Sequence, residues 1–195
     1  VHLTTFLLVR HGETDWNRER RFQGHADRAL NELGREQARE LAAELAGDGI
    51  QAVYASPLRR AAETAAILAA SLGLEVGFDA RLMEIDVGSW SGLTRDEIER
   101  RFPDAWERWR AGDRGWDGGE TYDELAVRVL AALHDIAVSH PDETVLVVGH
   151  GGTVRSMLAH AARTSIVELR RAVAPAANCS VHRVALRNGD LVRVD

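Results

Sequence analysis

Short apolar runs alternate with amphipathic helical patterns along this 195-residue chain, and that alternation restricts its fold more than any other feature. Three runs, Thr4–Arg10, Ile50–Ala55 and Thr144–Val148, are largely apolar and carry β-branched residues, which is typical of strands buried on both faces. Neighbouring strands that are connected through helices usually run parallel, because the helix carries the chain back to the edge where the next strand begins. The pattern therefore predicts an α/β fold with a mostly parallel central sheet flanked by helices on both faces.

Capping and stop residues mark the ends of the helical patterns. Asn31 should cap a helix that Gly47 and Gly49 end, and Pro57 should open the next helix at about its first turn. Other predicted elements are helices at 94–102, 104–111, 122–136, 152–162 and 165–171, a short strand at 75–78, and strands at 178–186 and 190–194. The last two strands could complete the sheet or pair across a homodimer. No repeat or linker divides the chain, so we expect a single domain over 1–195 with a lid-like insertion around 93–120.

The basic residues exclude several functions, because all 24 are arginine and the chain contains no lysine. Schiff-base enzymes, pyridoxal-phosphate enzymes and Walker-type phosphate loops each need a lysine amine. The 30 acidic residues give a formal net charge of -6, which argues against a nucleic-acid partner.

Features that bear on location favour the cytoplasm. No apolar run approaches the ~20 residues that span a bilayer, and Phe6–Val9 is too short for the core of a signal peptide. We therefore expect no membrane partner. The single cysteine, Cys179, cannot form an internal disulfide, which suits a reducing compartment. It lies in the predicted strand Cys179–Val184, where a structural thiol is far more common than a nucleophile.

Two of the predicted parallel strands end in a histidine: His11 follows the first, and His150 follows the strand that begins at Thr144. Ligand sites in open α/β sheets lie beyond the carboxyl ends of the strands, so the two imidazoles should face one pocket if these strands are neighbours. Arg59 or Arg60, after the strand Ile50–Ala55, would join Arg10 as forked donors for phosphate oxygens. Taken singly, such histidines are more often structural and such arginines more often solvated. Together they indicate a phosphoryl-transfer pocket without a metal, since neither histidine has a cysteine or carboxylate at metal-ligand spacing.

A series of short motifs follows the order found in a known family. They are Arg10-His11-Gly12-Glu13-Thr14 with Asn17 and Gln23-Gly24, Leu30-Asn31-Glu32-Leu33-Gly34 with Gln37-Ala38, Ser56-Pro57-Leu58-Arg59-Arg60-Ala61 with Thr64-Ala65, Leu82-Met83-Glu84 with Gly88-Ser89-Trp90-Ser91-Gly92, and Gly149-His150-Gly151. Together they cover residues 5 to about 160. On these motifs the chain resembles the histidine phosphatase superfamily, which has the phosphoglycerate mutase-like fold.

The resemblance implies a role for each matching residue. His11 would attack phosphorus and become a phosphohistidine. Glu84 would protonate the leaving group, which requires a pKa above its ~4.3 reference value, although it could instead only pair with an arginine. The other implied catalytic residues, which bind the phosphoryl oxygens, are Arg10, Arg60 and His150, and the implied substrate-binding residues are Asn17, Gln23, Gly24 and Gly151. Arg60 is preferred to Arg59 because it aligns with the family's Ser-x-Leu-x-Arg-Ala pattern. The resemblance implies no metal and no organic cofactor.

The span between Glu84 and His150 favours a phosphatase over a mutase. Cofactor-dependent phosphoglycerate mutases of this family carry a longer insertion there, with lysine and arginine that grip a carboxylate, whereas this span is short and lacks lysine. The turn at 118–121 resembles the phosphatase members, although Glu120 could simply cap the next helix. We therefore expect a metal-independent phosphomonoester hydrolase that acts on a small phosphorylated metabolite, such as a sugar phosphate or a phosphoglycerate-like ester. A 2,3-bisphosphoglycerate-dependent phosphoglycerate mutase is the alternative, and a non-enzymatic binder or a protein phosphohistidine phosphatase fits less well.

Two groups of residues near the expected pocket have two interpretations each. The tryptophans at 106, 109 and 116 could cover the pocket mouth or pack in the core. The cationic residues around Gln23 could hold a second anionic group or belong to a solvated loop; they are Arg20, Arg21, His25 and Arg28.

Overall fold

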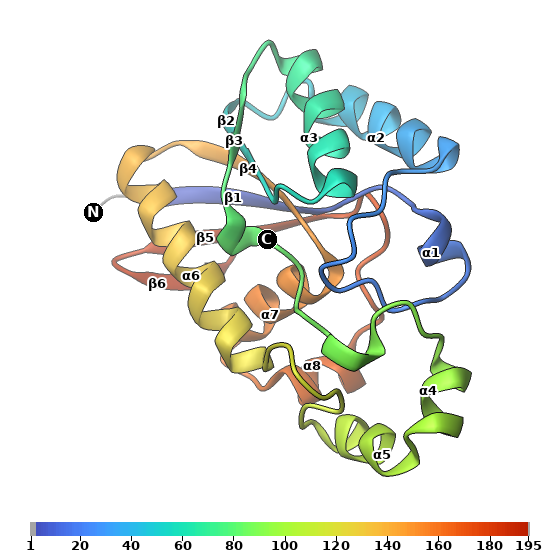
Figure 1. Cartoon of the computed structure of the whole chain (residues 1–195). Helices are drawn as coiled ribbons and strands as arrows, with labels where there is room; N and C mark the ends of the chain where they lie inside the picture. Colours follow the sequence, from blue (N-terminus) through green and yellow to red (C-terminus); the bar gives the residue numbers. More distant parts are fainter. Residues whose placement is uncertain (1–2, 195) are drawn as a thin grey trace.

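The computed structural model describes residues 3–194, and six strands within that range form one sheet in the order β3-β2-β4-β1-β5-β6 (Figure 1). They are β1 (Leu3–Arg10), β2 (Ile50–Ala55), β3 (Val76–Phe78), β4 (Thr144–Gly149), β5 (Val181–Arg187) and β6 (Asp190–Arg193). The strands β1 to β4 are parallel to one another, whereas β5 and β6 add an antiparallel edge beside β1. The predicted, mostly parallel sheet is confirmed, and the last two strands complete it.

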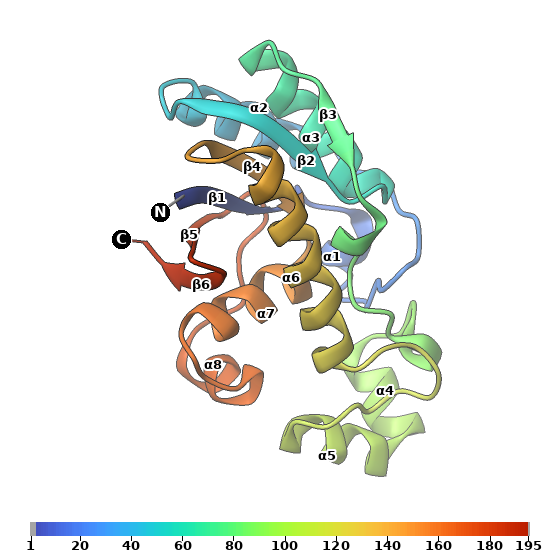
Figure 2. The same cartoon turned by 90° about the vertical axis from the view of Figure 1, so that its left-hand side faces the viewer.

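Helices cover both faces of the sheet, because strand side chains alternate between the two sides. Phe6 and Leu8 of β1 join an apolar cluster under α6 and α7, whereas Leu7 and Val9 join a cluster under α2 and α3 (Figure 2). The helices are α1 (Asp15–Arg18), α2 (Glu32–Leu45), α3 (Arg59–Leu72), α4 (Arg95–Arg101), α5 (Pro103–Ala111), α6 (Tyr122–Ser139), α7 (Gly151–Ala161) and α8 (Ile166–Ala172), with single 3-10 turns at Ala80–Leu82 and Gly88–Trp90. None of the helices between residues 3 and 194 is long and apolar enough to cross a membrane.

Local sequence signals predicted the start of α2 correctly, but they placed the start of α3 and the start of the strand near Cys179 a few residues too early. Asn31 caps α2, since its side chain accepts a hydrogen bond from the Gly34 N–H at 2.9 Å. The start of α3 lies two residues after Pro57, because Leu58 is still extended. Cys179 is not part of a strand: it has a φ of 56° and its N–H donates to the Arg10 carbonyl in a turn before β5. Burial raises the pKa of its thiol to about 12, which suits a structural cysteine.

The segment with α4 and α5 lies apart from the sheet in Figures 1 and 2. Its tryptophans pack against one another: the rings of Trp106 and Trp109 are stacked with centroids 4.9 Å apart, and Trp90 is in edge contact with Trp109 and Trp116. All four belong to the same apolar cluster as the α6 face of the sheet. Core packing therefore buries most of the surface of Trp106, Trp109 and Trp116, for which the sequence left open a place in the core or at the pocket mouth.

A close backbone approach joins the loop after β1 to the first turn of α2. The Glu13 N–H donates to the Gln37 side chain and the Asn31 N–H donates to the Glu13 carbonyl, at 2.9 and 3.0 Å. Gly12 and Gly34 leave no room between these backbones, because a Cβ on Gly34 would clash with the Glu13 carbonyl and a Cβ on Gly12 with the Gly34 carbonyl. Glycine at both positions lets α2 press directly on the loop that follows His11.

Replacing Gly34 with alanine should destabilise the protein, although alanine normally stabilises a helix relative to glycine. The expected loss is about 1–3 kcal/mol in the free energy of unfolding, because the new methyl group must push α2 away from the loop. Urea unfolding of Gly34→Ala measures it. The matched control is Gly47→Ala, since no atom lies within 4 Å of a Cβ there. Equal unfolding midpoints for the two variants would show that the close approach does not restrain α2.

Candidate active site

The segments that follow β1, β2 and β4 meet at the carboxyl edge of the sheet. Arg10 is paired with Gly149 at the ends of the neighbouring strands β1 and β4, so the next residues, His11 and His150, lie side by side. Their ring centroids are 5.3 Å apart at an interplanar angle of 62°. A cavity of about 510 Å³ opens over His11. Of the residues predicted for the site, its walls include Arg10, His11, Asn17, Gln23, Gly24, Arg60, Glu84 and Gly151.

His11 is held as a neutral imidazole with one nitrogen available. The ring is buried, and its Nδ1 lies 2.7 Å from the Gly12 carbonyl oxygen. A carbonyl only accepts, so Nδ1 carries the proton and Nε2 carries the lone pair. Burial, followed by the charges of Arg60 and Arg10, lowers the pKa of His11 well below its ordinary value. The imidazole can therefore act as a nucleophile at physiological pH.

Two guanidinium groups flank this imidazole, one from a fully buried arginine and one from a half-buried arginine. Arg60 is fully buried and donates to the carbonyls of Ala26 and Gly24 at 2.7 and 2.8 Å, and Arg10 donates to the Ala176 carbonyl at 2.6 Å. Burial lowers the pKa of Arg60 to about 10, partly offset by the nearby Glu84 carboxylate, so its side chain stays charged. The Nε–H groups of Arg10 and Arg60 are buried without a partner in the described part of the chain. The arrangement is suited to an anion that accepts from both forks.

His150 is in ring contact with His11 but, unlike His11, is not one of the described residues that line the cavity. It is fully buried at the start of α7, and its Nε2 lies 2.8 Å from the Ser56 hydroxyl oxygen. Burial, followed by the charges of Arg60 and His11, lowers its pKa well below the ordinary value. Ser56 donates to Nε2 in the tautomer that leaves the proton on Nδ1, and that nitrogen has no partner within residues 3–194. This tautomer gives the site a neutral donor.

The Glu84 carboxylate is oriented by backbone groups. One oxygen accepts from the Ile85 N–H at 2.9 Å, and the other accepts from the Gly152 N–H, in the first turn of α7, at 3.0 Å. The carboxylate makes no ion pair within the described residues, so the alternative in which Glu84 pairs with an arginine has no direct contact to support it. Glu84 therefore stands free to exchange a proton with a molecule in the cavity.

A guanidinium from α6 holds the backbone around Glu84. Arg128 donates to the carbonyls of Arg81, Met83 and Glu84 at 2.7, 2.7 and 2.9 Å. The same group binds both carboxylate oxygens of Glu120 at 2.6 and 2.7 Å. Glu120 thus orients Arg128 and does not cap the helix, whose cap is Thr121.

Besides further residues of the cavity wall, three residues that form side-chain hydrogen bonds at the predicted site were not singled out from the sequence as members of it. They are Ser56, Arg128, and Asn178, which donates to the His11 carbonyl at 2.8 Å. Ser56 had a signal, since it ends β2 next to the two histidine strands. Arg128 and Asn178 had none, because one arginine on a helix and one asparagine in a loop resemble many others.

The residues with open interpretations divide between the cavity and its surroundings. Trp109 and Trp116 line the cavity, whereas Trp106 packs behind Trp109. Of the four cationic residues around Gln23, Arg20 and Arg21 reach the cavity. His25 Nε2 lies 2.8 Å from the Glu84 carbonyl oxygen, and Arg28 lies 4.8 Å from the centroid of the Trp16 ring.

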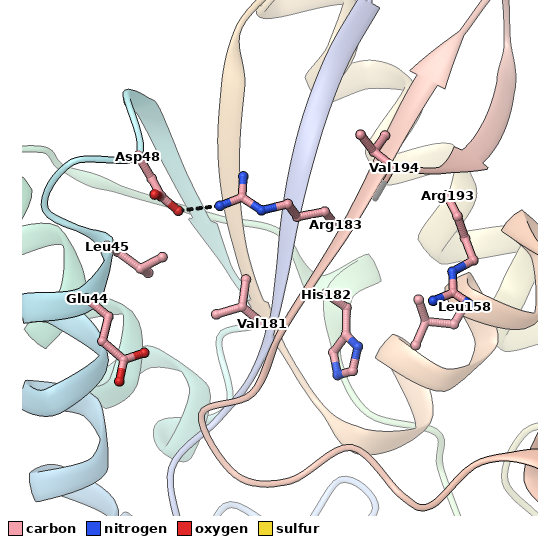
Figure 3. Close-up of a pocket in the computed structure, with 9 residues that line it drawn as sticks. All are labelled: Glu44, Leu45, Asp48, Leu158, Val181, His182, Arg183, Arg193 and Val194. Atoms are coloured by element: carbon pink, nitrogen blue, oxygen red, sulfur yellow. Dashed lines mark hydrogen bonds and ion pairs between the residues drawn. The ribbon is translucent and has the colours of Figure 1, made fainter.

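A second cavity, of about 430 Å³, lies at the β5–β6 edge and contains none of the predicted site residues (Figure 3). Its walls include His182, and the ion pair between Arg183 and Asp48, at 2.6 Å, lies beside it. Within residues 3–194 no group of three or more histidine, cysteine, aspartate or glutamate side chains could hold a metal ion. The chemistry-bearing residues are thus concentrated at the carboxyl edge of the sheet.

Known proteins resemble this chain over most of its length. Residues 6–194 match the histidine phosphatase superfamily (branch 1). Phosphoglycerate mutase-like protein 4 of Arabidopsis thaliana is 40% identical over 195 residues, covering 97% of this chain and 83% of that protein. Phosphoserine phosphatase 1 of Hydrogenobacter thermophilus is 36% identical over 157 residues, covering 80% and 74%. A solved mycobacterial glucosyl-3-phosphoglycerate phosphatase in complex with VO3 is 33% identical, covers 94% of this chain and 91% of its own, and has a TM-score of 0.82.

The lowered pKa of His11 makes a prediction about stability and pH. Below pH ~6.5 a histidine in the unfolded chain binds a proton, whereas the buried His11 of the folded protein stays neutral. Proton binding therefore stabilises the unfolded state, and the free energy of unfolding falls as the pH falls. Removing His11 should therefore reduce the loss of stability between pH 7.5 and 5.5 by about 1.4 kcal/mol. Urea unfolding of His11→Gln at both pH values tests this, with His160→Gln, an exposed histidine of α7, as the matched control. Equal pH dependence in the two variants would show that His11 is protonated in the folded protein.

Proposed function

The chain belongs to the histidine phosphatase superfamily, and we propose that it is a metal-independent phosphomonoester hydrolase that works through a phosphohistidine on His11. The observation that carries the proposal is a neutral, buried imidazole beside two arginines, each of which has a buried Nε–H without a partner among the described residues. The relatives named phosphoserine phosphatase and glucosyl-3-phosphoglycerate phosphatase support hydrolysis of a small phosphorylated metabolite.

In the first step the Nε2 lone pair of His11 attacks phosphorus, and the P–N bond forms as the bond to the ester oxygen breaks. Arg10, Arg60 and His150 donate to the phosphoryl oxygens, and the two arginines neutralise their charge, the role that Mg²⁺ has in many other phosphoryl-transfer enzymes. Glu84 gives its proton to the departing alkoxide, which otherwise leaves poorly. The Asn17 oxygen accepts from the Thr14 N–H at 3.1 Å, so its amide NH2 remains for the same phosphoryl group.

In the second step a water molecule attacks the phosphohistidine. Glu84 takes a proton from that water, the P–N bond breaks, and inorganic phosphate leaves with His11 restored to its neutral form. The held position of Glu84, on the backbone N–H groups of Ile85 and Gly152, supports one carboxyl group serving both steps.

We also propose that the chain is a single domain in which 93–120 acts as a lid over the site. Arg95, Trp109 and Trp116 of this segment lie in the cavity wall, and Thr94 bridges to Arg21 in the loop after β1. The single thiol, Cys179, is free, which supports a cytoplasmic location.

Replacing His11 with alanine should abolish turnover, because His11 is the one histidine among the described residues that line the cavity. Phosphate release is measured in EDTA from p-nitrophenyl phosphate, a sugar phosphate and both phosphoglycerates, with His160→Ala as the matched control. Steady-state release by His11→Ala would contradict the covalent mechanism, and loss of wild-type release in EDTA would contradict metal independence. Interconversion of the phosphoglycerates only when 2,3-bisphosphoglycerate is supplied would identify a mutase instead. Phosphoester binding without either reaction would identify a binder.

Replacing Glu84 with glutamine should slow alkyl phosphates by about 10²–10⁴-fold, because glutamine has no proton to give the alkoxide. Aryl phosphates should slow far less, since a phenolate leaves without help. The ratio of kcat for a sugar phosphate and p-nitrophenyl phosphate measures the difference. Asp86→Asn, which removes a carboxylate from the same loop, is the matched control and should leave that ratio unchanged. Equal slowing of both esters in Glu84→Gln would remove Glu84 from the proton-donor role.

A further inference from the structure

We propose that the cavity binds a second anionic group of its substrate, a carboxylate, on the guanidinium of Arg155. The inference rests on the proposed phosphatase function and adds the class of ester that the site prefers. It assigns a specificity-determining role to a residue of α7 that lines the cavity and takes no part in the phosphoryl-transfer steps above.

Helix geometry directs Arg155 toward the site. Gly151 and Arg155 are four residues apart in α7, so they share one face of the helix, and both line the cavity. Side chains of a helix lean toward its amino end, which for α7 is the end at His150. Gly151 has no side chain, and the Arg10 guanidinium lies over it. The Arg155 side chain therefore points along this face toward the phosphoryl site at Arg10.

Arg155 is a partly buried cation that no acid between residues 3 and 194 neutralises. Among the described residues it has neither an ion pair nor a hydrogen bond to a carboxylate, whereas Arg21, also in the cavity wall, is paired with Glu19 and Glu97. Glu84 is the only carboxylate that the cavity wall contributes within residues 3–194, and the mechanism uses it as the acid and base. Arg10 and Arg60 are the arginines proposed to hold the phosphoryl group. A charge thus remains for a second anion.

Other positive charges near Arg155 raise the electrostatic energy of its guanidinium when no anion is bound. Burial lowers the pKa of Arg10, Glu84 opposes this effect, and the positive charge of Arg155 lowers the pKa further. Burial lowers the pKa of Arg170 in α8, and the nearby positive charge of Arg155 lowers it further. The Arg170 guanidinium stacks 3.7 Å from the centroid of the Trp109 ring. A carboxylate of a molecule in the cavity, bound to Arg155, would offset the repulsion between these guanidinium groups.

The remaining wall near Arg155 offers ring surfaces and one hydroxyl. Trp109, Trp116 and Tyr122 line the cavity. Burial raises the pKa of Tyr122, so its hydroxyl keeps its proton and can donate to a carboxylate oxygen. A guanidinium fork matches the two oxygens of a carboxylate, and aromatic rings exclude the water that would otherwise solvate them.

The test compares esters that differ only in the carboxylate. O-phosphoserine is paired with O-phosphoethanolamine, and 3-phosphoglycerate with glycerol 3-phosphate. The variants are Arg155→Met and Arg155→Lys, with Arg100→Met, an exposed arginine of α4, as the matched control. We expect Arg155→Met to lower kcat/KM for the carboxylate-bearing esters by about 10–100-fold, mainly through KM, and to change their partners less than about threefold. Arg155→Lys should give an intermediate loss, because it keeps the charge and loses the fork.

Several results would overturn the inference. An equal loss for both members of each pair would place Arg155 with the phosphoryl group or the fold, and no loss for either would remove it from the site. A wild-type protein that hydrolyses p-nitrophenyl phosphate but shows no preference for the carboxylate-bearing esters would refute the second anion and leave the phosphatase proposal intact. Absence of p-nitrophenyl phosphate hydrolysis would count against the phosphatase proposal itself.

Discussion

The burial of the Arg60 guanidinium is the constraint on which the candidate site depends. A cation removed from water needs partners, and Arg60 finds them in the backbone carbonyls of Gly24 and Ala26. A carboxylate in their place would cancel the charge that the site needs for an anion. The segment between β1 and α2 brings these two carbonyl oxygens to one guanidinium, so the course of the chain at Gly24–Ala26 and the burial of the charge depend on each other.

Arg128 has a similar role in the segment that carries Glu84, where it also donates to backbone carbonyls. Its guanidinium gathers three carbonyls of the segment that ends in Glu84, and Glu120 orients it. The Gly152 N–H of α7 then fixes the carboxylate itself. The nucleophile His11 and the acid Glu84 thus lie on separate segments of the chain. In each segment, backbone carbonyl oxygens accept hydrogen bonds from one arginine, Arg60 or Arg128. The two arginines differ in one respect, since Arg128 is neutralised by Glu120 and Arg60 is not paired with an acid in the described structure.

The sequence predicted those features that carry a periodic or positional signal. Apolar runs predicted the parallel strands, and their ends placed His11 and His150 at one edge, where they lie 5.3 Å apart. Contacts between distant side chains and backbone carbonyls have no such signal, so the role of Arg128 among 24 arginines was not visible. The same limit applies to Cys179, whose strand-like neighbours concealed a turn that the Arg10 carbonyl stabilises.

The absence of lysine is consistent with the burial of this site. Desolvation lowers the pKa of Arg60 to about 10, which still leaves the group charged. The same desolvation of a lysine amine, which starts from ~10.4, would lower its pKa to about 8 and remove part of the charge near physiological pH. A buried phosphoryl site therefore favours cations that keep their protons when they are desolvated. Arginine satisfies this requirement, and its fork adds the directionality that a lysine amine lacks.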